Sequence, residues 1–232
     1  MFRSLLFKLF FYIGIIIIFI IAIPALILPN FLILRLGKIS GYWTIVCLKI
    51  FLNVNINVIG KENISDKENF FVASIHQSIF ETFFLQTIIN SPIFILKKEL
   101  LKIPIFGWHL RKINSISIDR NTITRDNLGF LDKISNIIKK TKRPLIIFPQ
   151  GTRTLSGIRA PFKKGVGRIY DHLKIKCLPI ALNSGNVWPK NGKLSPNTSI
   201  TISILKIIEP GMDKNSFLKL IEEKIYDELE KI

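Results

Sequence analysis

The chain has 232 residues, enough for one sizeable domain with an attachment segment. Hydrophobic residues make up 48%, and the mean hydropathy of +0.36 is high for a water-soluble protein. The net charge of +17 predicts an anionic partner such as a lipid surface, a phosphorylated substrate or nucleic acid. The two cysteines, Cys47 and Cys177, lie in apolar contexts, which excludes a disulfide framework and favours a reducing compartment.

The N-terminal segment has the composition of a membrane anchor. Residues 9–34 carry no charge and are flanked on both sides by Lys and Arg. About 20 apolar residues span a bilayer, but Pro24 and Pro29 favour a break, and a second amphipathic stretch follows. We predict that residues 1–52 form a membrane-anchoring helical hairpin that dips into one leaflet. A single span and a buried soluble helix are the alternatives.

Residues 53–232 alternate between patterns of strand and helix. Short apolar runs predict strands at 53–60, 70–73, 92–96, 116–118, 144–148, 176–182 and 199–208. Longer runs with helical periodicity predict helices at 82–89, 100–113, 121–140, 162–173 and from residue 215, the second of them interrupted at Pro104 and Gly107. This alternation predicts an α/β fold with a central, mostly parallel or mixed sheet flanked by helices.

A histidine and a carboxylate lie where the strand at 70–73 leads into the next helix. On a regular helix, five residues would turn His76 and Glu81 about 140° apart, so they meet only if His76 lies in the non-helical entry. Glu81 would then accept a hydrogen bond from one ring nitrogen and leave the other as a general base. The alternative is structural: Ser78 to Glu81 matches a capping box, and His76 is then an ordinary loop residue.

Two further loops after predicted strands carry groups suited to a phosphate. One ends in Arg120, and the other contains Gly151, Thr152 and Arg153. Glycine permits close approach of the backbone, threonine offers a hydroxyl, and the guanidinium fork fits phosphate oxygens. A loop arginine is more often a solvated charge. Because ligands gather where strands end in α/β sheets, however, the conjunction with His76 predicts one site.

Other chemistries lack their sequence patterns. The chain has no Gly-x-Ser-x-Gly, which argues against a nucleophile-elbow hydrolase, and no Walker loop. His109 and His172 form no zinc-type spacing with cysteine and are interpreted as structural or surface residues. No nucleic-acid-binding motif accompanies the charge. We therefore expect neither a metal nor a cofactor, and no nucleic-acid partner.

From about Val54 to Trp188 the chain resembles the glycerophospholipid acyltransferases, most closely the bacterial 1-acyl-glycerol-3-phosphate acyltransferases. The family's motifs occur in order: His-x4-Asp is matched by His76 with Glu81, the arginine-ending segment by 114–120, Phe-Pro-Glu-Gly-Thr-Arg by 148–153, and the strand with a central proline by 177–182. Glu81 replaces the usual Asp and Gln150 the usual Glu, so position 150 has a hydrogen-bonding role without charge. Asn114 and Ser117 stand where Gly and Pro are common. These departures bear on substrate preference more than on reaction type.

The resemblance implies transfer of a fatty acyl group from a thioester of acyl carrier protein or coenzyme A to lysophosphatidate. His76 would take the hydroxyl proton, and Glu81 would hold the imidazole tautomer. Arg120, Arg153, the Gly151–Thr152 backbone and Lys98 would bind the phosphate. Neither an acyl-enzyme nor a metal is implied. The protein would lie at the inner membrane, in contact with membrane lipid and with its active site facing the cytoplasm.

Two alternatives remain open at this point. In the first alternative, the protein is an acyltransferase whose acceptor is glycerol 3-phosphate or another lysolipid. In the second, the chain is a basic, membrane-anchored protein that binds anionic lipid without turnover.

Overall fold

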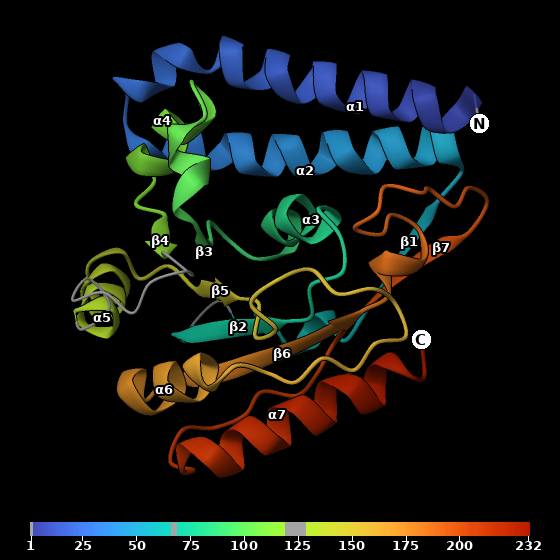
Figure 1. Ribbon diagram of the computed structural model, residues 1–232. Helices are drawn as coiled ribbons and strands as arrows, with labels where there is room; N and C mark the ends of the chain where they lie inside the picture. Colours follow the sequence, from blue (N-terminus) through green and yellow to red (C-terminus); the bar gives the residue numbers. More distant parts are fainter. Residues whose placement is uncertain (1, 66–68, 119–128) are drawn as a thin grey trace.

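The structure is a computed structural model that describes residues 2–65, 69–118 and 129–232. Its first two helices, α1 (Phe2–Ile21) and α2 (Asn30–Leu52), form a hairpin along one side of the molecule (Figure 1). They are joined through a short 3-10 turn, η1 (Ile23–Leu26). The predicted helical hairpin is thus confirmed. Both helices are long and apolar enough to cross a membrane, while their placement in one stays a prediction.

Two prolines separate the helices. Pro24 lies in η1, and Pro29 occupies the N-cap of α2, where the missing N–H costs no helical hydrogen bond. The other end of α2 is closed by Asn53, which adopts a left-handed conformation with φ of 51°, as is common after the last turn of a helix.

Among the described residues, seven strands form one mixed sheet in the order β1-β7-β6-β2-β5-β3-β4. Their bounds are β1 (Asn55–Ile59), β2 (Phe70–Ser74), β3 (Ile93–Lys97), β4 (Ile116–Ile118), β5 (Leu145–Ile147), β6 (Lys176–Leu182) and β7 (Ser199–Ile204). Strands β6, β2, β5, β3 and β4 are mutually parallel, whereas β7 and its parallel neighbour β1 run the other way. The prediction of a mixed sheet in an α/β fold is confirmed.

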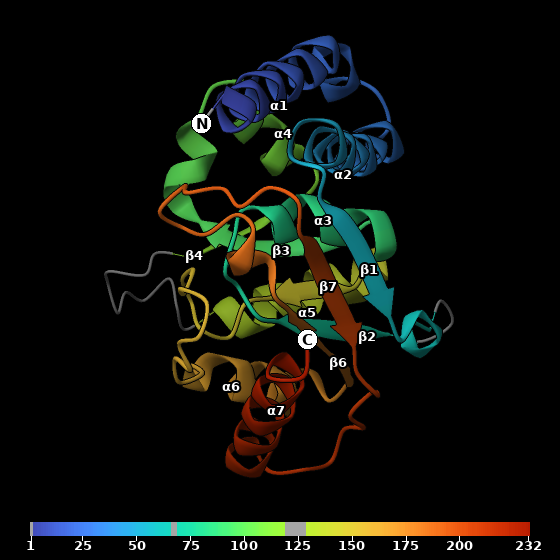
Figure 2. The same cartoon turned by 90° about the vertical axis from the view of Figure 1, so that its right-hand side faces the viewer.

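Helices cover both faces of this sheet (Figures 1 and 2). One face carries α3 (Phe80–Ile88), with α2 and then α1 stacked above it, and α4 (Phe106–Lys112) follows the 3-10 helix η3 (Lys98–Lys102). The opposite face carries α6 (Lys164–Leu173) and α7 (Lys214–Leu229), and α5 (Phe130–Thr141) packs beside α6. The chain therefore has a helical hairpin added to an α/β sandwich.

The hairpin shares its core with the α/β domain. Phe7 and Phe11 of α1 are buried, and each ring makes an edge contact with Trp188 at a centroid distance of 4.9 Å. Phe11 also meets Phe83 of α3 at 5.5 Å. Burying two phenylalanines stabilises this docking by about 3–6 kcal/mol. The division at residue 52 stays a prediction, and α1 is packed against both sides of it.

Three elements differ from their predicted bounds by more than two residues. The helix predicted at 100–113 is divided near Pro104 into η3 and α4, as expected, but Gly107 lies inside α4, so the predicted interruption at Gly107 is wrong. The strand predicted at 199–208 ends at Ile204, and Ile208 then forms an isolated bridge with Cys177. Pro179 lies between these pairings and has no N–H for the ladder, so the regular pairing is interrupted there. The predicted helix 121–140 begins at Phe130 as α5, and the earlier part of that prediction, with Asp119 and Arg120, lies outside the described residues.

Candidate active site

The loops that carry the predicted site residues leave the same edge of the sheet. Strands β2, β3, β4, β5 and β6 are parallel, so their carboxyl ends lie together. His76 follows β2, Lys98 follows β3, and Gly151 follows β5. The parallel order of the strands therefore assembles groups that are far apart in the sequence.

His76 is held by its backbone and by its ring. Its N–H donates to Gln150 Oε1 at 2.7 Å, and its carbonyl accepts from the Thr154 N–H at 2.9 Å. Phe148 stacks on the imidazole with centroids 4.1 Å apart and planes inclined by 17°. The side chain is only 15% exposed. The loop after β5 thus orients the histidine that follows β2.

Glu81, in the first turn of α3, is completely buried and surrounded by donors. Its Oε1 accepts from the backbone N–H groups of Gln77 at 2.8 Å and Ser78 at 2.9 Å, and from the Ser184 hydroxyl at 2.7 Å. Its Oε2 lies 4.0 Å from His76 Nδ1. The Ser78 N–H also reaches Oε2, at 3.1 Å. The carboxylate is therefore held mainly through Oε1, and Oε2 faces the imidazole.

The two interpretations of Glu81 describe the same residue in two roles. The bond from the Ser78 N–H to Glu81 is one half of the predicted capping box. The other half is not formed, because Ser78 Oγ accepts from the Phe80 N–H at 3.1 Å and the N-cap of α3 is Ile79. The distance of 4.0 Å to His76 exceeds a hydrogen bond, so the predicted direct bond is not formed in this state. Catalytic hydrogen bonds are often long without substrate and tighten when it binds. Capping and proximity to the histidine coexist.

Burial dominates the electrostatics of this carboxyl group. Desolvation raises the pKa of Glu81 from its ordinary value of 4.5 to about 7, against the opposing effect of hydrogen bonds from Gln77, Ser184 and Ser78. Each donor to the carboxylate therefore helps to keep it ionised near neutral pH.

Gln150 acts through its amide, as its lack of charge predicts. Its Oε1 accepts from the His76 N–H, and its Nε2 donates to Thr154 Oγ1 at 3.0 Å and to Tyr226 Oη at 3.3 Å. Tyr226 gives its own proton to the Ala160 carbonyl at 2.6 Å, and the Thr154 hydroxyl donates to the His76 carbonyl at 3.3 Å. Both hydroxyls must accept from position 150, and an amide with two protons satisfies both.

The predicted phosphate-binding residues lie in the loop that holds His76. Gly151 has φ of +72°, a left-handed conformation that favours glycine, and its N–H closes a turn with the Phe148 carbonyl at 2.9 Å. Thr152 is exposed, and Arg153 is half-buried directly before Thr154. Among the described residues, no hydrogen bond or ion pair engages the Arg153 guanidinium. This cation is therefore available in the loop that contacts His76 through Gln150 and Thr154.

The other two predicted binding residues have different outcomes. Lys98 begins η3 directly after β3 and is exposed, so it lies at the same sheet edge without contacting the other predicted residues that the structure describes. Arg120 lies outside the described residues; its predicted role is neither supported nor opposed by the structure.

The remaining histidines are structural or superficial, as predicted. His109 is buried in α4, with one ring nitrogen 2.8 Å from the Ile105 carbonyl and the other 3.1 Å from the Ala22 carbonyl, and the second contact lies between α4 and the hairpin turn. His172 pairs with Asp132 at 3.4 Å on the opposite face. In the described part of the chain, no cluster of His, Cys, Asp or Glu has the arrangement of a metal site.

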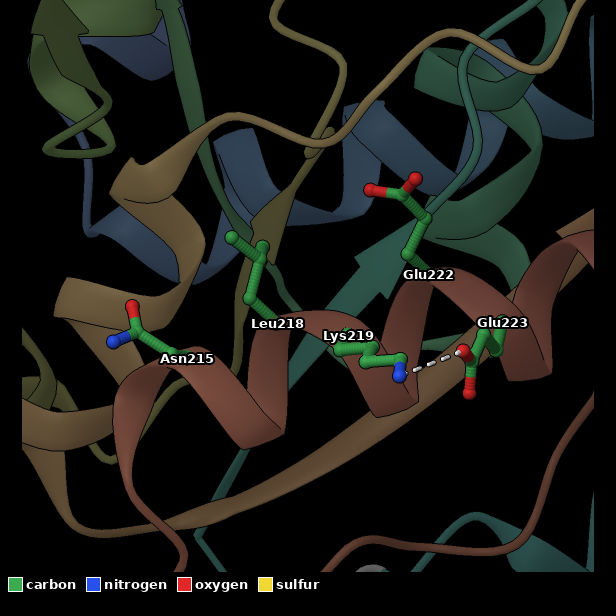
Figure 3. A pocket seen from close by; sticks show the side chains of 5 residues that line it. All are labelled: Asn215, Leu218, Lys219, Glu222 and Glu223. Atoms are coloured by element: carbon green, nitrogen blue, oxygen red, sulfur yellow. Dashed lines mark ion pairs between the residues drawn. The ribbon is translucent and has the colours of Figure 1, made fainter.

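A depression on the exposed side of α7 is unrelated to this site. Figure 3 shows its lining, which comes entirely from one helix. Lys219 pairs with Glu223 at 3.9 Å across one helical turn, and Glu222 accepts from the Phe162 N–H at 2.7 Å. Its charged groups are thus paired with each other or with backbone. It carries no group suited to acyl transfer.

Two buried residues of the site escape sequence reasoning. Gln77 accepts from the Gly185 N–H at 3.0 Å, and Ser184 donates to Glu81. A small hydroxyl two residues after the end of a buried strand is the signal that could have indicated Ser184. Nothing in the local sequence links it to Glu81, which is 103 positions away.

Comparison with known proteins agrees with this geometry. Residues 55–183, more than half of the chain, match the Acyltransferase family model. The chain is 36% identical over 144 residues to the 1-acyl-sn-glycerol-3-phosphate acyltransferase of Pseudomonas aeruginosa, covering 62% of this chain and 55% of that protein. It is 28% identical over 193 residues to the enzyme of that name from Saccharomyces cerevisiae, covering 80% and 63%. The chain therefore spans between about half and two thirds of these relatives.

The fold also has a solved counterpart. The crystal structure of the 1-acyl-sn-glycerophosphate acyltransferase of Thermotoga maritima superposes with a TM-score of 0.78 and 23% identity, covering 99% of this chain and 97% of that one. The family match includes β2, α3 and β5 together with the loops that carry His76, Glu81 and Arg153. This chain belongs to the acyltransferase family.

Proposed function

We propose that the protein transfers a fatty acyl group from an acyl thioester to the free hydroxyl of 1-acylglycerol-3-phosphate, making phosphatidate for phospholipid synthesis. The observation that carries this proposal is the pairing of His76 with the buried Glu81, 4.0 Å apart, beside a loop that presents Arg153. The names of the relatives support the choice of acceptor.

The chemistry requires one base and one substrate alcohol. His76 Nε2, the ring nitrogen directed away from Glu81, would take the proton as the hydroxyl oxygen attacks the thioester carbonyl. When the tetrahedral intermediate collapses, the C–S bond breaks, and the imidazolium returns its proton to the departing thiolate. Base catalysis of this kind contributes about 10²–10⁴-fold in rate. Glu81 would stabilise the imidazolium between these two transfers.

The acceptor's phosphate would bind beside the histidine. Arg153 supplies a bidentate cation, and the Gly151–Thr152 backbone permits close approach. Lys98 and Arg120 would contribute further charge from the loops after β3 and β4. The family match covers residues 55–183 and includes all of these residues together with His76.

The membrane supplies the acceptor, and the surface of the hairpin fits that role. Most of the large apolar side chains exposed by the described residues lie between Phe2 and Ile50. Patches of this extent mark interaction sites, and here they are bordered by the cations Arg3, Lys8 and Lys38. We place the hairpin in the inner membrane and the active site on the cytoplasmic side, where thioesters of acyl carrier protein or coenzyme A are the donors.

A thiol-release assay tests the proposal. Purified protein is incubated with acyl-coenzyme A or acyl carrier protein thioester and with lysophosphatidate, glycerol 3-phosphate or another lysolipid in turn. We expect release that depends on lysophosphatidate and is lost in His76→Ala. Faster release with another acceptor would reassign the substrate. Membrane binding without release for any pair would favour the non-catalytic lipid-binding protein.

A further inference from the structure

A short segment after β6 is hydrogen-bonded to Glu81 and to the loop that carries His76. Ser184 and Gly185 begin the 3-10 turn η5 (Ser184–Asn186), and both are completely or almost completely buried. The Ser184 hydroxyl donates to Glu81 Oε1 at 2.7 Å, and the Gly185 N–H donates to Gln77 Oε1 at 3.0 Å. Gln77 in turn donates its own N–H to Glu81 Oε1 at 2.8 Å. The contacts form a closed ring around one carboxylate oxygen.

Ser184 is the one side-chain donor in this ring to the carboxylate; the other two donors, Gln77 and Ser78, act through backbone N–H groups that the loop itself provides. All three donors reach Oε1, and the Ser78 N–H also reaches Oε2 at 3.1 Å. Oε2 therefore faces His76 at 4.0 Å with one shared backbone donor, while Ser184 bonds Oε1 alone. Among the described residues, the titratable group that faces Glu81 is His76, and the donors from η5 and from the β2–α3 loop are neutral. The ionised form of Glu81 is therefore disfavoured by burial and favoured by a few hydrogen bonds.

We propose that Ser184 is a positioning residue that keeps the Glu81 carboxylate ionised and turned towards His76. This inference rests on the proposed function for its catalytic consequence, but its structural claim concerns Glu81 alone. Position 184 lies one residue beyond the matched family region, which ends at 183. Desolvation already raises the Glu81 pKa to about 7, so the loss of a donor to the charged form would leave the carboxyl mostly protonated at neutral pH.

The protein contains a matched control. Ser203, on β7, is also buried and donates to Glu228 Oε1 at the same distance of 2.7 Å. Glu228 belongs to α7, on the face opposite α3. Ser203→Ala therefore removes an equivalent serine–carboxylate bond without touching the site. Ser184→Thr keeps the hydroxyl and tests for recovery.

The experiment has one readout that does not need catalysis. The full chain is labelled with ¹³C at the glutamate carboxyl, and the Glu81 signal, assigned by its absence in Glu81→Gln, is titrated in wild type and variants. We expect Ser184→Ala to raise the midpoint by about one pH unit or more, as the loss of a hydrogen bond to a charged group implies. Ser184→Thr should restore it, and Ser203→Ala should leave it unchanged. An unmoved midpoint in Ser184→Ala would overturn the inference even if the enzyme is an active acyltransferase.

Kinetics supplies the second readout. In Ser184→Ala the acidic limb of the profile of kcat/KM against pH should move upward by a similar interval, with activity recovering at alkaline pH. Equal loss at every pH would show that Ser184 acts only through packing and would overturn the positioning role. If wild type releases no thiol with any acceptor, the proposed function fails, while the carboxyl titration still decides the role of Ser184.

Discussion

Replacing Glu81 with glutamine separates what this residue does for the fold from what it does for catalysis. The amide oxygen can still accept from Gln77, Ser78 and Ser184, so the cap is retained. The negative charge that faces His76 is lost. We expect turnover to fall by about 10²–10⁴-fold while the folded structure persists.

The structure also predicts the sign of the change in stability with pH. The folded-state pKa of Glu81, about 7, lies above the ordinary value of 4.5. The stability contributed by the protonated group is therefore fully present below about pH 4.5 and is lost as the pH rises through about 7. This interval corresponds to a loss on the order of 3 kcal/mol in wild type. Glu81→Gln does not titrate and should lack this decline.

The assay measures the free energy of unfolding of both proteins in one detergent at a series of pH values, together with thiol release. The difference between variant and wild type removes the contribution of titrating groups that do not interact with Glu81. Glu222→Gln is the matched control, because Glu222 also accepts from a backbone N–H, at 2.7 Å, but lies on α7. Near-normal turnover in Glu81→Gln would refute the dyad. A difference in stability that is constant with pH would refute the effect of burial.

Three further substitutions test other parts of the site and the hairpin. Arg153→Lys keeps the charge and loses the fork, so KM for lysophosphatidate should rise about tenfold with little change in KM for the thioester; the opposite selectivity would remove Arg153 from the phosphate site. Gln150→Glu restores the residue common in the family but offers no proton to the Thr154 and Tyr226 hydroxyls. We expect the free energy of unfolding to fall by about 1–3 kcal/mol, with a lower melting temperature and a lower kcat. Unchanged stability and kcat would contradict the hydrogen-bond network. Ile16→Asp, at a side chain 57% exposed on α1, should release the protein from vesicles, whereas Ile59→Asp, at one 54% exposed on β1, should not; equal binding would place the membrane surface elsewhere.

The pattern of apolar residues was sufficient to predict most elements. The apolar pattern predicted both ends of β6 correctly. The two prolines before Asn30 predicted the break between the helices of the hairpin. These predictions succeed because backbone propensity and one-sided burial are local properties. Bounds were wrong where tertiary pairing decides them, as at β7, where Pro179 on the neighbouring strand ends the ladder at Ile204.

The site shows the same division. The sequence alone was sufficient to predict which groups carry the proposed chemistry, because the motifs around His76, Glu81 and Arg153 are short and continuous. Only the tertiary structure decided that Gln150 holds the His76 backbone and that Ser184 anchors Glu81. Those contacts join segments 74 and 103 positions apart, brought together because parallel strands deliver their carboxyl ends to one edge of the sheet. Burial of Glu81, which raises its pKa, likewise arises only when the fold brings Ser184 and the loop of His76 against its carboxylate.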